Sequence, residues 1–445
     1  MRAAVVADAL LDRPLAERAH DTARLLATRI ADPEHVTATV AASPTDPNTP
    51  GARLGSSLLA GDAGVALVLR TASRALPESA EFWARSARAR LATAVRSTRE
   101  TPVRGPGIGF GTAGLALVVS DFAADEPRYG EALGKLHGQL LDQLAAAPLT
   151  VGEGGVRDSD YDAIQGSAGI LGHLVSVPAP RATLRQGAHL LIDHLVQLCL
   201  PTRRDAAPNW VIPPRYYPLP EYLEEYPHGY VNLGLAHGLA GPLAALSLAW
   251  RAGYRRKGLA TAVQRTSAYL CATAVQDEFG VDWPTGVPLG PDGDETPVKS
   301  PARAAWCYGA PGITSALLQA AHATGDDRLR EFATTALEAS LRRIRAGRHA
   351  YSATLCHGLA GVLAITAAAA RSTRSASLRA SLPWLTERVV DACHPDLPFG
   401  VRNSEPHHPP IDNPDLLVGA AGVAAALWSV SSSVSGRWQR CLLIA

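Results

Sequence analysis

Two cysteines and two histidines occupy equivalent positions in a repeated sequence pattern. A Gly-x-x-Gly motif followed by an apolar stretch occurs seven times, and the two residues before its first glycine differ between copies. In copies four, five and six these pairs are Ala236-His237, Cys307-Tyr308 and Cys356-His357. If equivalent repeat positions lie at one height around a central cavity, we expect these thiols and imidazoles to converge.

Two thiolates and an imidazole form a ligand set for Zn²⁺. A Cys₂His set with an open fourth position is typical of catalytic sites, since structural zinc sites usually have four protein ligands. Thiolates also select zinc over magnesium or calcium. The sequence therefore predicts one zinc ion per chain, held by Cys307, Cys356 and His357. The alternative is that both cysteines are small buried apolar residues and the histidine is a core residue.

Two other residue pairs have metal-binding side chains but lie outside the repeat. Cys393-His394 is followed by Pro395, and no Gly-x-x-Gly motif comes after it. His407-His408 lies in a proline-rich segment. We expect neither pair to bind zinc.

The seven copies indicate a helical repeat protein. They begin at Gly61, Gly111, Gly166, Gly238, Gly309, Gly358 and Gly419. Between them lie amphipathic stretches, such as residues 15–30 and 327–344, with apolar residues at helical spacing. Each repeat is therefore predicted to be a hairpin of one amphipathic helix and one nearly all-apolar helix.

A closed arrangement explains the apolar helices best. A helix that is apolar all round must be buried on every side. An open solenoid, the alternative, needs polar terminal caps, and the last copy is as apolar as the middle ones. We therefore predict an all-α fold, an α/α toroid of seven helical hairpins. It forms a single domain over residues 1–445, with the repeats at about 50–430.

Composition narrows the functional class. The 445 residues include 42 Lys and Arg against 41 Asp and Glu, so the strongly basic surface of a nucleic-acid-binding protein is excluded. Six cysteines are too few for a disulfide framework in a chain of this length. Residues 230–250 carry no formal charge, but they include Asn232, His237 and Pro242 and are predicted to be buried rather than membrane-spanning. With no secretory signal apparent, we expect a cytoplasmic protein.

Four motifs resemble those of the LanC family of lanthipeptide cyclases. They are YDAIQGSAG (161–169), NLGLAHGLAG (232–241), SPARAAWCYGAPG (300–312) and TLCHGLAG (354–361). The resemblance implies a seven-hairpin α/α toroid with a catalytic zinc, which agrees with the independent prediction above. It also implies the zinc ligands Cys307, Cys356 and His357 and the catalytic residues His237, Arg303 and Asp162.

The family reaction adds a peptide cysteine thiol to a dehydroalanine or dehydrobutyrine of the same peptide, which forms a lanthionine or methyllanthionine ring. Zinc deprotonates a bound thiol. Arg303 could stabilise the resulting enolate, and His237 could either accept the thiol proton or donate one to the enolate carbon. Asp162 could orient His237. Alternatively, Arg303 is a surface arginine and Asp162 a helix N-cap.

Three other functions remain as alternatives. LanC-like proteins also add glutathione to dehydrated residues, and a toroid of this kind could be a non-catalytic scaffold of a peptide-modification complex. The third alternative is another α/α-toroid enzyme, such as a glycosidase or a zinc prenyltransferase. The glycosidase would need a carboxylate pair in the cavity, and the aligned positions carry none.

The resemblance also implies partners. The chain begins 60 residues before Gly61, the first glycine of the repeat. In this short N-terminal segment the chain resembles a stand-alone class I cyclase. Its substrate would be a dehydrated precursor peptide with leader and core, made by a separate dehydratase. A membrane transporter complex is a further candidate partner, and a synthetase complex would place the enzyme peripherally at the membrane.

Overall fold

The protein is built mainly from two alternating kinds of α-helix. The computed structural model describes residues 10–44, 53–147, 149, 151, 154–200, 209–298, 300–348, 352–434 and 436–444. In these ranges, the helices that start at Gly-x-x-Gly motifs are α3 (Asp62–Ala75), α5 (Thr112–Ala123), α8 (Ser167–Ser176), α11 (Ala240–Arg251), α13 (Ala310–Thr324), α15 (Leu359–Thr373) and α17 (Ala420–Ser431). The predicted all-α class is confirmed.

The second kind of helix comes before, between or after these. Its members are α1 (Arg13–Ala31), α4 (Ala80–Glu100), α6 (Gly130–Ala146), α9 (Ala182–Cys199), α12 (Leu259–Ala272), α14 (Asp327–Arg345) and α16 (Ala376–Asp391). Four further α-helices complete the described set: α2 (Pro33–Ala42), α7 (Asp158–Tyr161), α10 (Tyr222–Glu225) and α18 (Trp438–Cys441).

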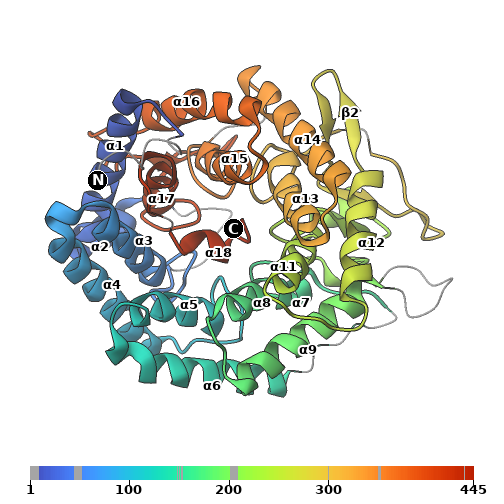
Figure 1. The fold of residues 1–445 in the computed structure, drawn as a ribbon, viewed down its shortest axis with the longest axis horizontal. Helices are drawn as coiled ribbons and strands as arrows, with labels where there is room; N and C mark the ends of the chain where they lie inside the picture. The colour runs from blue at the N-terminus through green and yellow to red at the C-terminus, as the bar shows by residue number, and fades with distance from the viewer. Residues whose placement is uncertain are drawn as a thin grey trace. The chain divides into compact units, whose positions relative to one another are not determined.

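The chain divides into two compact units. Unit 1 comprises Met1–Val103, Asp121–Pro127 and Ala350–Trp438, and unit 2 comprises Arg104–Ser120, Arg128–His349 and Gln439–Ala445. In unit 1, α3 packs on α4 and α15 packs on α16 (Figure 1). In unit 2, α8 packs on α9, α11 on α12 and α13 on α14. Each of these pairs is a hairpin of consecutive helices, as the repeat pattern predicts.

The last repeat of the chain obtains its amphipathic partner from the beginning of the chain. Helix α17 packs along α1, and the two lie side by side in Figure 1. All residues of α17 from Ala420 to Val430 are buried. Helix α1 instead buries a single stripe, made of Leu15, Ala19, Ala23, Leu26, Ala27 and Ile30. This 3–4-residue spacing is that of one helix face covering a core.

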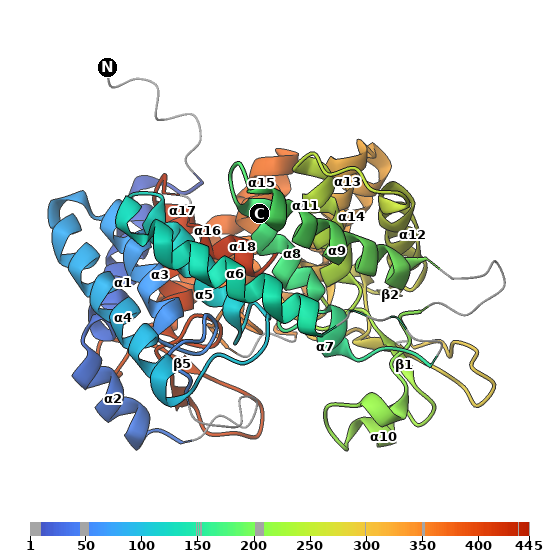
Figure 2. The same cartoon turned by 90° about the horizontal axis from the view of Figure 1, so that it is seen from below.

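Three small antiparallel sheets lie in the connections between helices. Strand β1 (Tyr230–Asn232) pairs with β4 (Gly286–Pro288), and β2 (Val275–Asp277) pairs with β3 (Gly280–Asp282). In unit 1, β5 (Arg402–Asn403) pairs with β6 (Ile411–Asp412). Figure 2 shows α10 next to β1, where the rings of Tyr226 and Tyr230 stack with centroids 4.4 Å apart. These pairings hold the connections that lead into the predicted site motifs.

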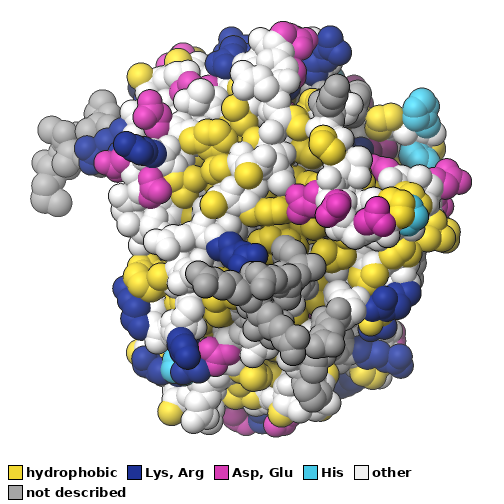
Figure 3. Space-filling model, turned by 90° about the vertical axis from the view of Figure 1, so that its right-hand side faces the viewer, with side chains coloured by type: hydrophobic (Ala, Val, Ile, Leu, Met, Phe, Trp, Pro, Cys, Tyr) yellow, Lys and Arg dark blue, Asp and Glu magenta, His cyan; other side chains and the backbone are white. Residues whose placement is uncertain are grey.

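The described helices and one face of the surface can be set beside the compositional predictions. No helix within the described residues has both the length and the apolar character needed to cross a bilayer. On the face in Figure 3, Lys and Arg side chains are interspersed with Asp and Glu side chains, in keeping with the net charge of +1.

A buried ion-pair network joins the first and seventh repeats in unit 1. Arg53 contacts Asp62 over 2.9 Å and Asp415 over 2.7 Å. Asp62 also accepts a hydrogen bond from Arg90 over 2.9 Å, and the Arg90 side chain is only 2% exposed. Because a buried charge is costly without its partner, this network has to remain complete.

We expect Asp62→Asn to lower the free energy of unfolding by about 3 to 5 kcal/mol, because it leaves Arg90 buried without its counter-charge. Thermal and urea denaturation would measure the change. Glu17→Gln, which breaks the exposed Arg13–Glu17 pair, is the control and should leave the melting temperature unchanged. Equal melting temperatures for Asp62→Asn and wild type would contradict the expectation.

Candidate functional site

Backbone hydrogen bonds join the equivalent repeat positions within unit 2. The amide of Gly109 in the second copy donates to the carbonyl of Ile164 in the third copy over 2.8 Å. The amide of Ala163, the residue before Ile164, donates to the carbonyl of Ala236 in the fourth copy over 2.9 Å, and the amide of Ala236 donates to the carbonyl of Cys307 in the fifth over 3.3 Å. Consecutive copies of this unit therefore lie with their equivalent positions side by side.

The same connection recurs within unit 1. The amide of Cys356 in the sixth copy donates to the carbonyl of Leu417 in the seventh over 2.9 Å. The amide of Leu417 donates in turn to Leu59 of the first copy over 3.0 Å. The position that carries a cysteine in the fifth and sixth copies is thus a regular structural position in both units.

Asp162 closes the turn that leads into α8. Its Oδ1 atom accepts hydrogen bonds from the amides of Ile164, Gln165 and Gly166 over 2.9, 2.6 and 2.8 Å. A Cβ atom on Gly166 would lie 2.1 Å from the amide nitrogen of Asp162, so only glycine fits this turn. Asp162 therefore organises the turn before α8 with one carboxylate oxygen, but it is not the N-cap considered as an alternative, because Gly166 occupies that position and no side chain caps α8.

The other carboxylate oxygen of Asp162 contacts His237. Its Oδ2 atom lies 2.6 Å from Nδ1 of His237. The carboxylate is 1% exposed, whereas the imidazole retains 39% exposure. This contact fixes the orientation of the ring and engages Nδ1, so Nε2 is the ring nitrogen available to exchange a proton.

The surroundings of His237 raise the pKa of its imidazole to about 9. Burial acts in the opposite direction and lowers it, but the hydrogen bond that Nδ1 donates to Asp162 and the charge of Asp162 outweigh that effect. The charges of Asp158 and Cys307 raise the pKa further. Since the ordinary histidine pKa is near 6.5, the pair keeps a proton on the ring at neutral pH.

Asp158 and Tyr161, both in α7, were not identified from the sequence. The hydroxyl of Tyr161 donates to the carbonyl of His237 over 3.2 Å, and Tyr161 is fully buried. Burial raises the pKa of Asp158, and the charge of Asp162 adds to this effect while His237 opposes it. The sequence signal that could have identified Asp158 was its spacing, since it lies four residues, about one helical turn, before Asp162.

Cys307 and Arg303 lie on one tight turn before α13. Gly309 has φ of +77°, and a Cβ atom there would lie 2.2 Å from the carbonyl oxygen of Arg303. Glycine is therefore required for the chain to fold back over Arg303. The amide of Ala310 is capped by the buried carboxylate of Asp282 over 2.9 Å, which anchors the start of α13.

His357 is held by residues from the β5–β6 segment. Its Nε2 atom lies 2.6 Å from a carboxylate oxygen of Glu405 and 3.1 Å from Oδ1 of Asn403. The side chains of His357 and Glu405 are 8% and 9% exposed. Sequence analysis identified neither Glu405 nor Asn403, because they lie outside the repeat motif and follow His357 by more than 40 residues.

The three predicted metal ligands supply two thiols and one imidazole, a set that could hold a metal ion. Cys307 and His357 are buried, and Cys356 is half-buried. The Cys393 thiol instead donates to the carbonyl of Val389 over 3.3 Å, and burial raises its pKa to about 12.

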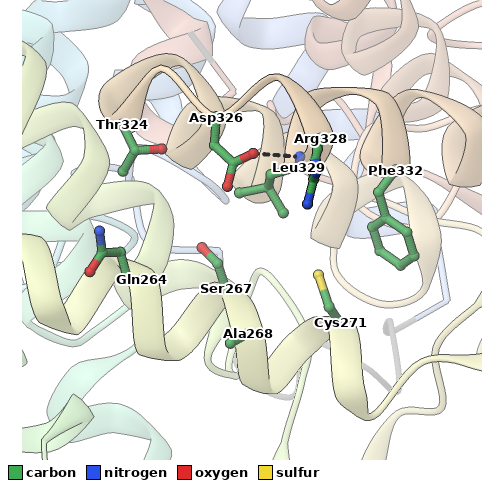
Figure 4. A pocket seen from close by; sticks show the side chains of 9 residues that line it. All are labelled: Gln264, Ser267, Ala268, Cys271, Thr324, Asp326, Arg328, Leu329 and Phe332. Atoms are coloured by element: carbon green, nitrogen blue, oxygen red, sulfur yellow. Dashed lines mark hydrogen bonds between the residues drawn. The ribbon is translucent and has the colours of Figure 1, made fainter.

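A separate cavity of about 330 Å³ lies between α12 and α14, as Figure 4 shows. It is lined by Gln264, Ser267, Ala268, Cys271, Thr324, Asp326, Arg328, Leu329 and Phe332. None of the predicted site residues is among these. Burial raises the pKa of Cys271 to about 11, which makes its thiol a poor nucleophile at neutral pH.

Comparison with known sequences identifies the family. Residues 53–443 match the sequence model of the family described as "Lanthionine synthetase C-like protein". The chain belongs to this family. A curated relative of this lanthionine synthetase C-like protein is "Nisin biosynthesis protein NisC" of Lactococcus lactis subsp. lactis. The two are 27% identical over 261 residues, which are 57% of this chain and 60% of that relative.

The fold of the lanthionine synthetase C-like chain is shared with a solved structure of "Nisin cyclase". The TM-score is 0.74 at 21% sequence identity, and the match covers 92% of this chain and 97% of the other. This likeness confirms the predicted fold class, an all-α protein of the α/α-toroid type.

Proposed function

We propose that this protein is a zinc-dependent lanthipeptide cyclase. It adds cysteine thiols of a peptide to dehydroalanine or dehydrobutyrine residues of the same peptide and so forms thioether rings. The observation that carries the proposal is the ligand set of Cys307, Cys356 and His357 in a member of the lanthionine synthetase C-like family. The names of the two relatives, a nisin biosynthesis protein and a nisin cyclase, support this substrate class.

The chemistry of the three donors fits zinc. Two thiolates and a neutral imidazole are ligands of catalytic zinc sites, which keep a further position open. The contact of His357 Nε2 with Glu405 leaves Nδ1 as the donor atom. When bound, zinc supplies the positive charge that lowers the pKa of a substrate thiol.

His237 is proposed to handle the proton of the reaction. Asp162 engages Nδ1 of its ring, so the proton is exchanged at Nε2. Because the pKa of this imidazole is raised to about 9, the ring is protonated at neutral pH. We therefore assign His237 the role of proton donor to the enolate carbon, and Asp162 that of the residue that orients and charges it.

Arg303 is proposed to stabilise the negative charge of the enolate. It is four residues before Cys307 on the turn that Gly309 closes. A guanidinium group is always protonated, so it can stabilise charge that develops on a carbonyl oxygen without entering proton transfer.

The proposed substrate implies a preceding reaction. Dehydroalanine and dehydrobutyrine arise by loss of water from Ser and Thr, so a dehydratase has to act on the precursor peptide first. We propose a dehydrated leader–core peptide as the substrate, a separate dehydratase as a functional partner, and a cytoplasmic place of action.

Ring formation can be tested directly with purified protein and a dehydrated precursor peptide. The reaction breaks an S–H bond and the C=C π bond of the dehydro residue and forms one C–S and one C–H bond, so the peptide mass stays constant. We expect the peptide to lose its capacity for thiol alkylation in mass spectrometry, at a rate above that without enzyme. A parallel reaction with glutathione separates the alternatives: a peptide that gains the mass of glutathione would favour intermolecular addition. No change in either reaction would favour the scaffold.

A further inference from the structure

Glu405 is a largely buried carboxylate whose partner is a predicted metal ligand. Its side chain is 9% exposed and its oxygen lies 2.6 Å from Nε2 of His357, a short charge-assisted contact. Burying a carboxylate is costly unless it is hydrogen-bonded or paired. The segment after β5 nevertheless places this charge against the ring of His357.

Asn403 supports the same ring atom from strand β5. Its Oδ1 atom is 3.1 Å from Nε2 of His357 and also accepts hydrogen bonds from the hydroxyls of Ser352 and Thr354 over 3.0 and 3.3 Å. Because Glu405 and Asn403 both present acceptor oxygens, Nε2 has to carry the hydrogen. The lone pair of the ring is then on Nδ1.

We propose that Glu405, assisted by Asn403, is a positioning residue for the metal centre. It holds His357 in the tautomer that carries the lone pair on Nδ1, the form that binds zinc through this atom, and its negative charge makes that nitrogen a stronger donor. A carboxylate or carbonyl on the second nitrogen of a metal-binding histidine fixes the ring in this way. This inference rests on the proposed function, since it takes zinc as the bound metal.

The zinc dissociation constant of the full-length protein tests the inference. We expect Glu405→Gln to weaken zinc binding, measured by competition with a chelator, by about 10- to 100-fold. Glu405→Ala, which removes the acceptor as well as the charge, should weaken it more. Asp412→Asn is the matched control, because it breaks the Arg402–Asp412 pair of the same hairpin, 3.0 Å long, without touching His357. It should leave the dissociation constant unchanged.

Three results of the zinc-binding measurement would overturn the proposed role of Glu405. An unchanged dissociation constant in Glu405→Gln would overturn the inference and leave the proposed function intact. Equal weakening in Glu405→Gln and Asp412→Asn would also overturn it, because the effect would then come from the hairpin fold. A wild-type protein that binds no zinc would overturn this inference together with the proposed function.

Discussion

Cys356→Ala is expected to remove zinc from the protein and to abolish enzymatic ring formation. Zinc bound by two thiolates and one imidazole loses a third of its protein ligands in this variant, and the remaining pair no longer forms a complete catalytic set. Cys307→Ala should have the same effect. Elemental analysis of zinc per chain and the thiol-alkylation assay measure both consequences on one preparation.

Cys393→Ala is the matched control for these variants. Its thiol donates a hydrogen bond to the carbonyl of Val389 within unit 1, and burial raises its pKa, so the thiol stays protonated. We therefore expect full zinc content and full activity. Zinc retained in Cys356→Ala but lost in Cys393→Ala would refute the proposed ligand set. Zinc lost from both would point to a general loss of structure, which the melting temperature would reveal.

His237→Asn is expected to slow ring formation by about 10²- to 10⁴-fold, the usual contribution of a general acid or base. The variant should keep its zinc, since His237 is not among the proposed ligands. Initial rates under saturating peptide, measured together with zinc content, separate this effect from metal loss. His408→Asn, in an exposed loop, is the control and should react at the wild-type rate. A wild-type rate in His237→Asn would exclude it from the chemistry.

The pH dependence of the rate distinguishes the two proton roles of His237. A proton donor acts in its protonated form, so activity should fall as the pH rises through about 9. In Asp162→Asn the ring loses the hydrogen bond and charge that raise its pKa, so the decline should move to lower pH. A rate that instead increases over this range, with the increase moving to lower pH in Asp162→Asn, would assign the role of base to the neutral ring.

The helical repeat could be predicted from the sequence because its signals are local. A glycine that starts each apolar helix, and apolar residues at 3–4-residue spacing in α1 or α14, are set by the conformation of neighbouring residues. Alignment of the copies on those glycines was then enough to select Cys307, Cys356, His357 and His237 as candidates. The backbone bonds from Ala163 to Ala236 and from Ala236 to Cys307 give Cys307 and the residue before His237 their regular placement within unit 2. The bond from Cys356 to Leu417 does the same for Cys356 within unit 1.

Contacts between distant residues were decided only by the tertiary structure. No periodicity relates α1 to α17, yet the amphipathic helix α1 covers the apolar helix α17. An apolar helix has to be buried, and the fold brings the beginning of the chain to it. The carboxylate of Asp162 meets a ring 75 residues away, and that of Glu405 meets one 48 residues away. A carboxylate in a loop is not part of a repeating sequence pattern, so the residue that it contacts depends on how the backbone folds around it. The sequence thus determined which residue types were available for the chemistry, and the fold determined which of them touch, since hydrogen bonds and charges act only over a few ångströms.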